Sequence, residues 1–214
     1  METKEQNTLL EEIEAVENMC NFVASLESLT QSIGIPIDEL LVPARRLTYK
    51  ARLAIGHTIM PICKVISGGQ TGADRAALDA AMKAGISTGG YCPSGRKSED
   101  DVIPEQYPLD EIQGGYRQRT RKNVEVADGT VIFYDRMPTG GTALTIEFCL
   151  KLKKPFKLID RDMVESKHAA LAIRQFSIEH NVACLNVAGP RESGCPGMYD
   201  YVLDSMRKTL MLEA

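Results

Sequence analysis

The chain has 214 residues, of which 43% are hydrophobic, and its formal net charge is -4 at pH 7. This length allows one substantial core with an appendage, but hardly two full domains. The negative net charge argues against broad binding to nucleic acids or membrane surfaces, so local groups must hold any anionic ligand. The 6 cysteines include no CxxC pair, so neither a disulfide framework nor a thiolate zinc site is indicated.

The first sixty or so residues have a helical pattern. Apolar residues recur at helical spacing from Leu9 to Leu29, and a second helical stretch opens at Asp38 and is interrupted by Pro43. We therefore predict a helical hairpin over residues 1–60 that packs on the following domain, mediates self-association or docks a partner. No apolar run is long enough to span a membrane and the start is unlike a signal peptide, so we expect a cytoplasmic protein.

After Met60, short β-branched runs alternate with helical segments. This alternation is typical of βαβ units, so residues 61–214 are predicted to form a Rossmann-like α/β domain with a mostly parallel sheet sandwiched by helices. The predicted strands are 63–67, 86–88, 129–135, 156–160 and 183–188, and the predicted helices are 74–85, 116–128, 142–154, 163–180 and 198–212. In such a sheet, ligands bind at the carboxyl ends of the strands.

A first glycine-rich loop, SGGQTGAD, leads from the first of these strands into a helix. Gly68, Gly69 and Gly72 permit tight turns and close approach of a ligand, while free N–H groups and the helix dipole favour an anion such as phosphate. The spacing matches neither a P-loop nor the standard dinucleotide motif. The alternative is a plain strand-to-helix turn capped by Thr71 or Asp74.

A second glycine-rich loop, PTGGTALTIE, repeats this arrangement at residues 138–147. Thr142 and Thr145 can donate hydroxyl hydrogen bonds beside the N–H groups of a helix terminus. Glu147 either complements the helix dipole, grips a ribose or pterin, or acts as an acid/base. Two such loops in one sheet predict a site for a phosphate-bearing ligand.

Three further segments accompany the loops. A basic cluster at residues 116–122 is expected on a helix, where Arg117 and Arg121 share one face and Arg119 points elsewhere. Residues 89–100 are rich in turn formers and are expected to form a loop over the pocket mouth. Residues 186–201 follow the last strand and should also lie on the crevice side.

The sequence offers no metal site. The three histidines are too scattered for a metal triad, and no Ser/His/Asp arrangement stands out. Cys92 and Cys195 lie in crevice-side loops and could ligate a soft metal, but each lacks a second ligand at metal spacing, so we assign no metal ligands.

Taken together, the motifs resemble those of the molybdenum-cofactor carrier family, a Rossmann-like branch of the SLOG superfamily that also includes the lonely-guy phosphoribohydrolases. The similar stretches include SGGQTGADRAALDAA, YRQRTRKNVEVADGTVIF, TGGTALTIEF and LNVAGPRESGCPGMY. The resemblance implies a homo-oligomer that binds molybdenum cofactor, a pterin with a terminal phosphate and a dithiolene-held metal, and stores it or delivers it to molybdoenzymes without turnover. It implies a pocket formed by Gly68, Gly69, Thr71, Gly72, Asp74, Arg96, Arg119, Thr120, Asn123, Thr139, Gly140, Gly141, Thr142, Thr145 and Glu147.

Two alternatives remain open. One is a phosphoribohydrolase-like enzyme on nucleoside 5'-monophosphates, with Glu147 as acid/base and Arg119 as an electrostatic clamp. Those enzymes carry PGGxGTxxE, and here the Thr and Glu persist while the leading Pro and one Gly do not. The other is a nucleotide-sensing module without turnover, in which the N-terminal helices transmit the ligand state to a partner.

Overall fold

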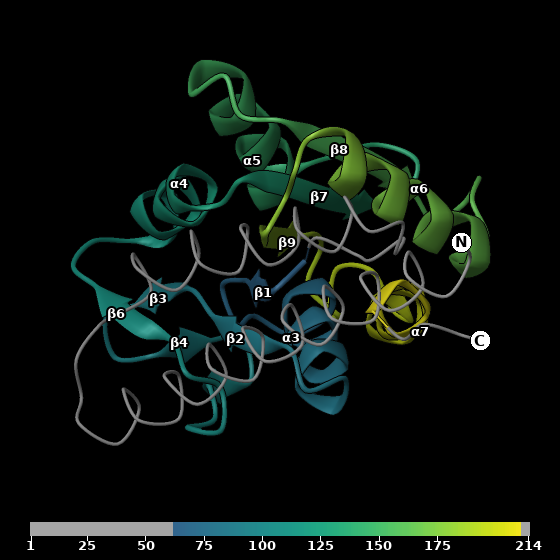
Figure 1. Ribbon diagram of the computed structural model, residues 1–214. Coiled ribbons are helices and arrows are strands. Elements are labelled where there is room, and N and C mark those ends of the chain that lie inside the picture. Colours follow the sequence, from purple (N-terminus) through teal and green to yellow (C-terminus); the bar gives the residue numbers. More distant parts are fainter. Residues whose placement is uncertain (1–61, 211–214) are drawn as a thin grey trace, which may run out of the picture. The chain divides into compact units, whose positions relative to one another are not determined.

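The computed structural model describes residues 62–210, so the predicted N-terminal hairpin over residues 1–60 lies outside the described residues. The described part is built on a five-stranded sheet in which every neighbouring pair is parallel (Figure 1). The strands lie in the order β2 (Ser87–Gly89), β1 (Lys64–Ile66), β9 (Cys184–Ala188), β7 (Gly129–Tyr134) and β8 (Phe156–Asp160). The predicted α/β class with a parallel sheet is confirmed.

The central strands are mostly apolar, as expected for a sheet with helices on both faces. Val131, Ile132 and Phe133 of β7 are fully buried, and Val131 is paired in register with Val187 of β9. Strand β8 lies at an edge, and its Leu158 is exposed. Strand β9, the last strand of the described residues, lies in the middle of the sheet.

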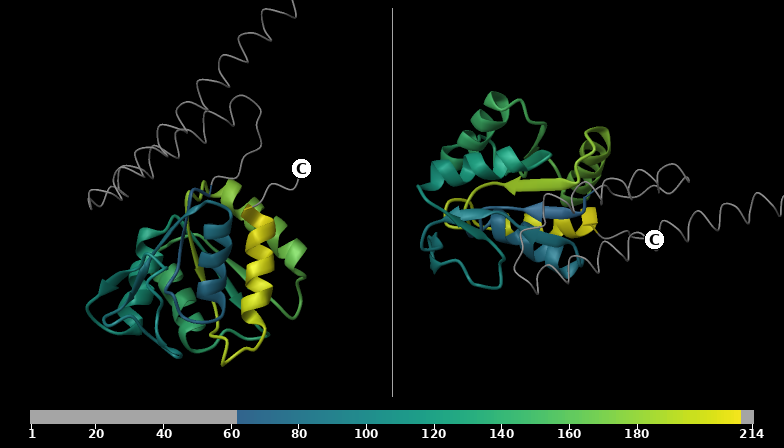
Figure 2. Two further views of the ribbon diagram at one scale, coloured as in Figure 1. Left: turned by 90° about the horizontal axis from the view of Figure 1, so that it is seen from below. Right: turned by 60° about the vertical axis from the view of Figure 1, so that its left-hand side comes forward.

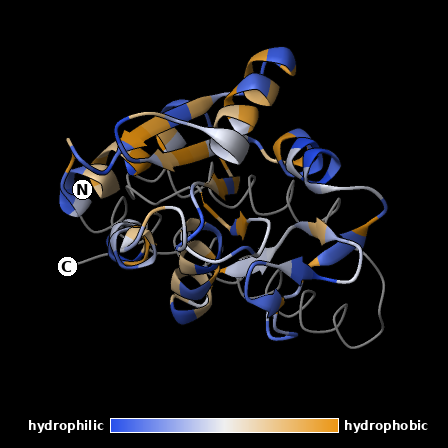
Figure 3. Cartoon of the chain, turned by 180° about the vertical axis from the view of Figure 1, so that it is seen from behind, coloured by the Kyte–Doolittle hydropathy of each residue, from blue (hydrophilic) through white to orange (hydrophobic). Residues whose placement is uncertain are grey.

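The helices form one layer on each face. Helices α3 (Ala73–Lys83), α6 (Ser166–Glu179) and α7 (Met198–Leu210) lie on one face, and α4 (Tyr116–Val126) and α5 (Gly140–Lys151) lie on the other (Figure 2). Right-handed crossovers explain this division, because the direction of a crossover decides which face its helix covers. The β1-to-β2 and β8-to-β9 connections, which contain α3 and α6, run in one direction across the sheet. The β7-to-β8 connection, which contains α5, runs in the other direction. Hydrophobic residues are concentrated on the central strands of the sheet, whereas α4 is largely hydrophilic (Figure 3).

The segment expected as a loop over the pocket contains short strands of its own. Strand β3 (Tyr91–Pro93) pairs with β6 (Asp110–Ile112), and β4 (Lys97–Ser98) pairs with β5 (Asp101–Val102). Arg96 holds this segment together by donating hydrogen bonds to four backbone carbonyls, those of Ile103, Pro104, Tyr107 and Leu109. The turn-forming residues predicted a loop, but long-range hydrogen bonds and a small apolar cluster order it.

No helix within residues 62–210 is long and apolar enough to cross a membrane.

The parallel topology brings the carboxyl ends of β1, β7 and β9 to the same edge. The loops that follow these strands, at residues 67–72, 135–139 and 189–197, therefore lie close together.

Candidate ligand-binding site

A cavity of about 880 Å³ lies at this edge of the sheet. It is lined by the loops that follow β1, β7, β8 and β9 and by the first turns of α4 and α5. Of the residues expected in the pocket, those that line this cavity are Asp74, Arg119, Thr120, Thr139, Gly141, Thr142 and Thr145. The expected site residues outside its lining are Gly68, Gly69, Thr71, Gly72, Arg96, Asn123, Gly140 and Glu147.

Arg119 and Asp74 form a buried ion pair in the cavity wall. Arg119 Nη1 lies 3.4 Å from Asp74 Oδ2, and the two side chains are 12% and 6% exposed. Burial raises the pKa of Asp74, while Arg119 and the backbone N–H of Gln70 act in the opposite direction. Gly68 makes the pair possible, since the Arg119 guanidinium occupies the space that a Cβ atom on residue 68 would fill.

Gln70 leaves a hydrogen-bond acceptor without a partner beside this pair. Its Nε2 donates to the carbonyl of Lys97 at 2.8 Å, which fixes the orientation of the amide, since a carbonyl can only accept. Among the described residues, Gln70 Oε1 and Arg119 Nε are buried without a hydrogen-bond partner. Each such group costs about 1–3 kcal/mol, and both residues line the cavity. Because both atoms are buried, only a ligand that shifts these side chains can bond to them, and it would present a donor to Gln70 and an acceptor to Arg119.

The second glycine loop opens directly onto space. A Cβ atom built on Gly141 would meet no atom within 4 Å, and Gly141 lines the cavity. The N–H groups of Thr142 and Ala143 bond to the carbonyl of Thr139, at 3.0 and 3.3 Å. Helix geometry leaves the N–H groups of Gly140 and Gly141 without an intrahelical acceptor, and the α5 dipole adds positive potential there. This arrangement suits a phosphate group.

Two side chains of α5 are engaged within the protein. The Thr145 hydroxyl donates to the carbonyl of Gly141 at 2.9 Å. Glu147 contacts Lys151 Nζ at 2.5 Å and Arg117 Nη2 at 3.4 Å, and the hydrogen bond from Lys151 lowers the pKa of Glu147. Glu147 is therefore an ionised carboxylate outside the cavity lining, a poor position for a general acid.

Arg96 and Asn123 have structural partners. Arg96 donates hydrogen bonds to backbone carbonyls of the β3–β6 segment. Asn123 of α4 accepts a hydrogen bond from the backbone N–H of Tyr91 at 2.8 Å and donates to its carbonyl at 3.1 Å. Both side chains therefore hold backbone segments together, and neither lines the cavity.

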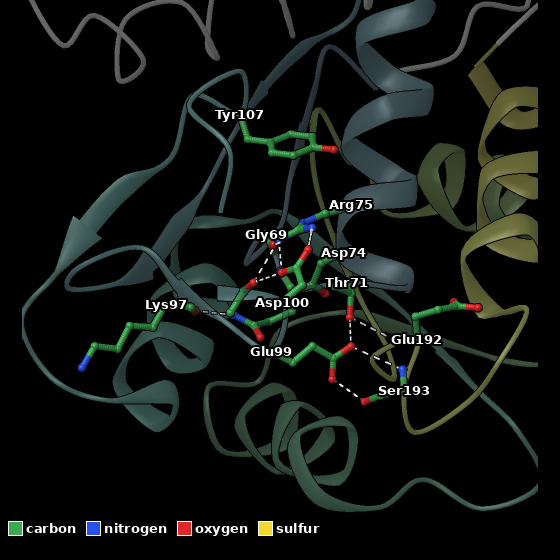
Figure 4. Close-up of polar contacts among 12 residues, drawn as sticks. Gly69, Thr71, Asp74, Arg75, Lys97, Glu99, Asp100, Tyr107, Glu192 and Ser193 are labelled. Atoms are coloured by element: carbon green, nitrogen blue, oxygen red, sulfur yellow. Dashed lines mark hydrogen bonds and ion pairs between the residues drawn. The ribbon is translucent and has the colours of Figure 1, made fainter. Parts of the chain in front are cut away.

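Thr71 and Glu99 join the first glycine loop to the loop after β9. Glu99 accepts hydrogen bonds from the hydroxyl groups of Thr71 and Ser193 (Figure 4), and the backbone N–H of Glu192 donates to Thr71 Oγ1 at 3.3 Å. Gly72, with a φ of 74°, allows this contact, since a Cβ atom there would lie 2.5 Å from the carbonyl oxygen of Pro190. The function of these residues in the structure is to hold the two loops against each other.

A further polar group in the cavity wall was not predicted from the sequence. Asp135 forms an ion pair with Arg161, and Cys195 Sγ lies 3.6 Å from Asp135 Oδ2. Arg161 lowers the pKa of Asp135, whereas burial raises the pKa of the Cys195 thiol. All three residues line the cavity. Asp135 and Arg161 directly follow strands β7 and β8, and that position could have identified them.

Within residues 62–210, no group of three or more His, Cys, Asp or Glu side chains is arranged to hold a metal ion. Cys92 lies in an apolar cluster rather than in the cavity lining, and burial raises the pKa of its thiol.

Comparisons with known proteins agree with this architecture. The model of the Circularly permutated YpsA SLOG family matches residues 65–210. A crystal structure described as that of "Putative molybdenum carrier protein" from Syntrophus aciditrophicus SB is 43% identical, with a TM-score of 0.69, and the match covers 71% of this chain and 96% of that chain. No curated protein matches the chain. The central position of β9, the last strand, fits a permuted order of elements. The resemblance inferred from the motifs is confirmed, and the chain belongs to the Circularly permutated YpsA SLOG family.

Proposed function

We propose that the protein binds a phosphorylated small molecule, the molybdenum cofactor, in this cavity and acts as its carrier without turnover. The observation that carries the proposal is Gly141, which places the N-terminus of α5 against open space in the cavity wall. The name of the related protein from Syntrophus aciditrophicus supports the choice of ligand.

The residues of the cavity fit the parts of this ligand. The terminal phosphate suits the first N–H groups of α5. A pterin ring carries both N–H donors and acceptors, which suit the polar side chains of Gln70 and Arg119 in the lining. The cofactor holds its metal through its own dithiolene sulfurs, so it needs no thiolate from the protein, and this agrees with the raised pKa of Cys195. A cavity of about 880 Å³ is in the range of cofactor sites.

The phosphoribohydrolase alternative receives less support. Glu147, its acid/base, lies outside the cavity lining and is ionised by its contact with Lys151. Release of a free base from any member of a nucleoside monophosphate panel would favour the enzyme over the carrier. The expected homo-oligomer, cytoplasmic location and delivery to molybdoenzymes belong to the carrier proposal.

The substitution Gly141→Asp tests the phosphate position. The new side chain has room, and a carboxylate at a helix N-terminus stabilises the helix by about 0.3–1 kcal/mol, so the fold should remain intact. Two like charges about 4 Å apart repel by about 4 kcal/mol at an effective dielectric of 20, so cofactor affinity should fall at least about tenfold. Gly141→Asn, of the same shape without the charge, is the matched control.

The measurement is retention of molybdenum cofactor after anaerobic loading and gel filtration. We expect retention by the wild type and by Gly141→Asn, and loss from Gly141→Asp. Equal retention by Gly141→Asp, or no retention by the wild type, would contradict the proposal.

A further inference from the structure

Tyr116 and Arg191 form a stacked pair in the cavity wall. The Arg191 guanidinium carbon lies 4.9 Å from the centre of the Tyr116 ring, and both residues line the cavity. Tyr116 is the first residue of α4, and Arg191 lies in the loop that follows β9. Two distant parts of the chain thus combine an aromatic ring and a planar cation at one place.

Tyr116 keeps much of its surface exposed. It is 42% exposed, although it lines a concave surface. Its position is fixed by the start of α4, where the Gln118 side chain accepts a hydrogen bond from the backbone N–H of Gly115 at 3.0 Å. An exposed aromatic face held on a rigid helix end is a surface on which a planar ligand can stack.

Arg191 differs from the other arginines of the lining. Arg117, Arg119 and Arg161 each form an ion pair with a carboxylate. Within residues 62–210, Arg191 has no carboxylate within ion-pair distance. Its charge is not neutralised by an ion pair in the described part of the chain, although it acts at longer range on the carboxylate of Glu99, which also lines the cavity.

The backbone is held on both sides of Arg191, and on the N-terminal side the N–H of Ala73 donates to the carbonyl of Pro190 at 3.2 Å. The N–H of Glu192 donates to Thr71, and Glu99 accepts hydrogen bonds from the N–H and hydroxyl of Ser193 (Figure 4). Gly72 permits the close approach, with the carbonyl carbon of Arg191 only 2.9 Å from the place of a Cβ atom. Because this loop is already ordered, little conformational entropy remains to be lost when a ligand stacks there.

We propose that Tyr116 and Arg191 form a stacking subsite for a planar nitrogen heterocycle, in a ligand whose phosphate lies at the N-terminus of α5. This inference rests on the proposed function and assigns the two residues that hold the heterocycle, a part of the ligand that a sugar phosphate lacks. Helices α4 and α5 lie side by side (Figure 1), so their first turns, with Tyr116 and Gly141, line one cavity. Stacking on an aromatic side chain tolerates different rings, so hydrogen bonds elsewhere must select among them.

Three probes separate the two parts of the ligand: neopterin monophosphate, ribose 5-phosphate and unphosphorylated neopterin. Calorimetry on the full chain should show that neopterin monophosphate binds at least about tenfold more tightly than ribose 5-phosphate, a difference of about 1.4 kcal/mol. Tyr116→Ala should remove most of this difference and leave ribose 5-phosphate within about twofold of its wild-type affinity. Tyr116→Phe, the matched control, keeps the ring and should bind like the wild type.

A spectroscopic readout is independent of affinity. The chain has 0 Trp residues, so Tyr116→Trp introduces a single tryptophan at the subsite. Neopterin monophosphate should quench its emission by stacking, and ribose 5-phosphate should not.

The outcomes distinguish the inference from the function on which it rests. Equal affinities for the two phosphates, or an equal loss of both in Tyr116→Ala, would overturn the subsite while the phosphate position stands. Binding of neopterin that depends on Tyr116, with no gain from its phosphate, would retain the subsite and overturn the phosphate position. No binding of any probe would overturn both.

Discussion

Replacing Gly68 with alanine is expected to break the buried ion pair between Arg119 and Asp74. A Cβ atom on residue 68 would lie 2.8 Å from Arg119 Nε and still closer to Cζ and Nη1, so the guanidinium must move. Removing one partner from a buried pair costs about 3–5 kcal/mol. Asp74 can take up a proton instead of remaining as an unpaired charge, and this limits the loss of stability. The free energy of that protonation scales with the pKa of Asp74, at about 1.36 kcal/mol for each pKa unit. We expect unfolding free energy to fall by about 2–4 kcal/mol at pH 7.

The pH dependence of this loss follows from the pKa of Asp74. Burial raises that pKa above its ordinary value of 3.8, so the charged form is disfavoured in the folded protein. The stability that proton binding to Asp74 contributes is fully present below the pKa of this residue in the unfolded chain, and it is lost as the pH rises through its pKa in the folded protein. Displacing Arg119 raises the folded pKa further, so Gly68→Ala should destabilise less at pH 5 than at pH 7.

Urea unfolding of the full chain at both pH values measures these effects. In an Arg119→Ala background the obstacle is gone, and the φ of Gly68 lies outside the left-handed region. Alanine should then be neutral or stabilising by about 0.4–1 kcal/mol. An equal loss from Gly68→Ala in both backgrounds would refute the reasoning, because the coupling between the two positions would be zero.

Three further predictions concern the surroundings of the pocket. Arg96→Met removes four hydrogen bonds to carbonyls, so limited proteolysis should cleave residues 97–112 faster than in the wild type; an unchanged rate would contradict the proposed bracing. Hydrogen bonding by Arg75 lowers the pKa of Asp100 to about 2, so the contribution of Asp100 to stability is present above its unfolded pKa and is lost as the pH falls toward 2. Asp100→Asn should therefore flatten the acid limb of a pH–stability profile, and an unchanged limb would contradict this prediction. Glu147→Gln should leave the affinity for neopterin monophosphate within about twofold in calorimetry, whereas a large loss would place this side chain at the ligand.

The sheet and its helices were predictable because local patterns decide them. The strands predicted at 129–135 and 156–160 and the helix predicted at 163–180 closely match β7, β8 and α6. The β3–β6 segment was not predictable, because its short strands depend on the side chain of Arg96 reaching carbonyls up to thirteen residues away.

The location of the site was predictable, and the positions of its side chains were less so. The rule for parallel sheets places both glycine loops at one edge, where the cavity lies. Spacing alone does not reveal that Thr71 braces Glu99, or that Asn123 binds the backbone of Tyr91. The contact of Arg191 with Tyr116 could not be predicted from the sequence either, because it depends on the packing of segments that are far apart in the sequence.

The most direct test of the carrier proposal is mass spectrometry of the small molecules released from freshly purified protein kept under anaerobic conditions. The account predicts a phosphorylated pterin with its metal, recovered from the wild type and from Gly141→Asn but not from Gly141→Asp. Recovery of an unphosphorylated compound, or of the same phosphorylated pterin in equal amount from Gly141→Asp, would contradict it.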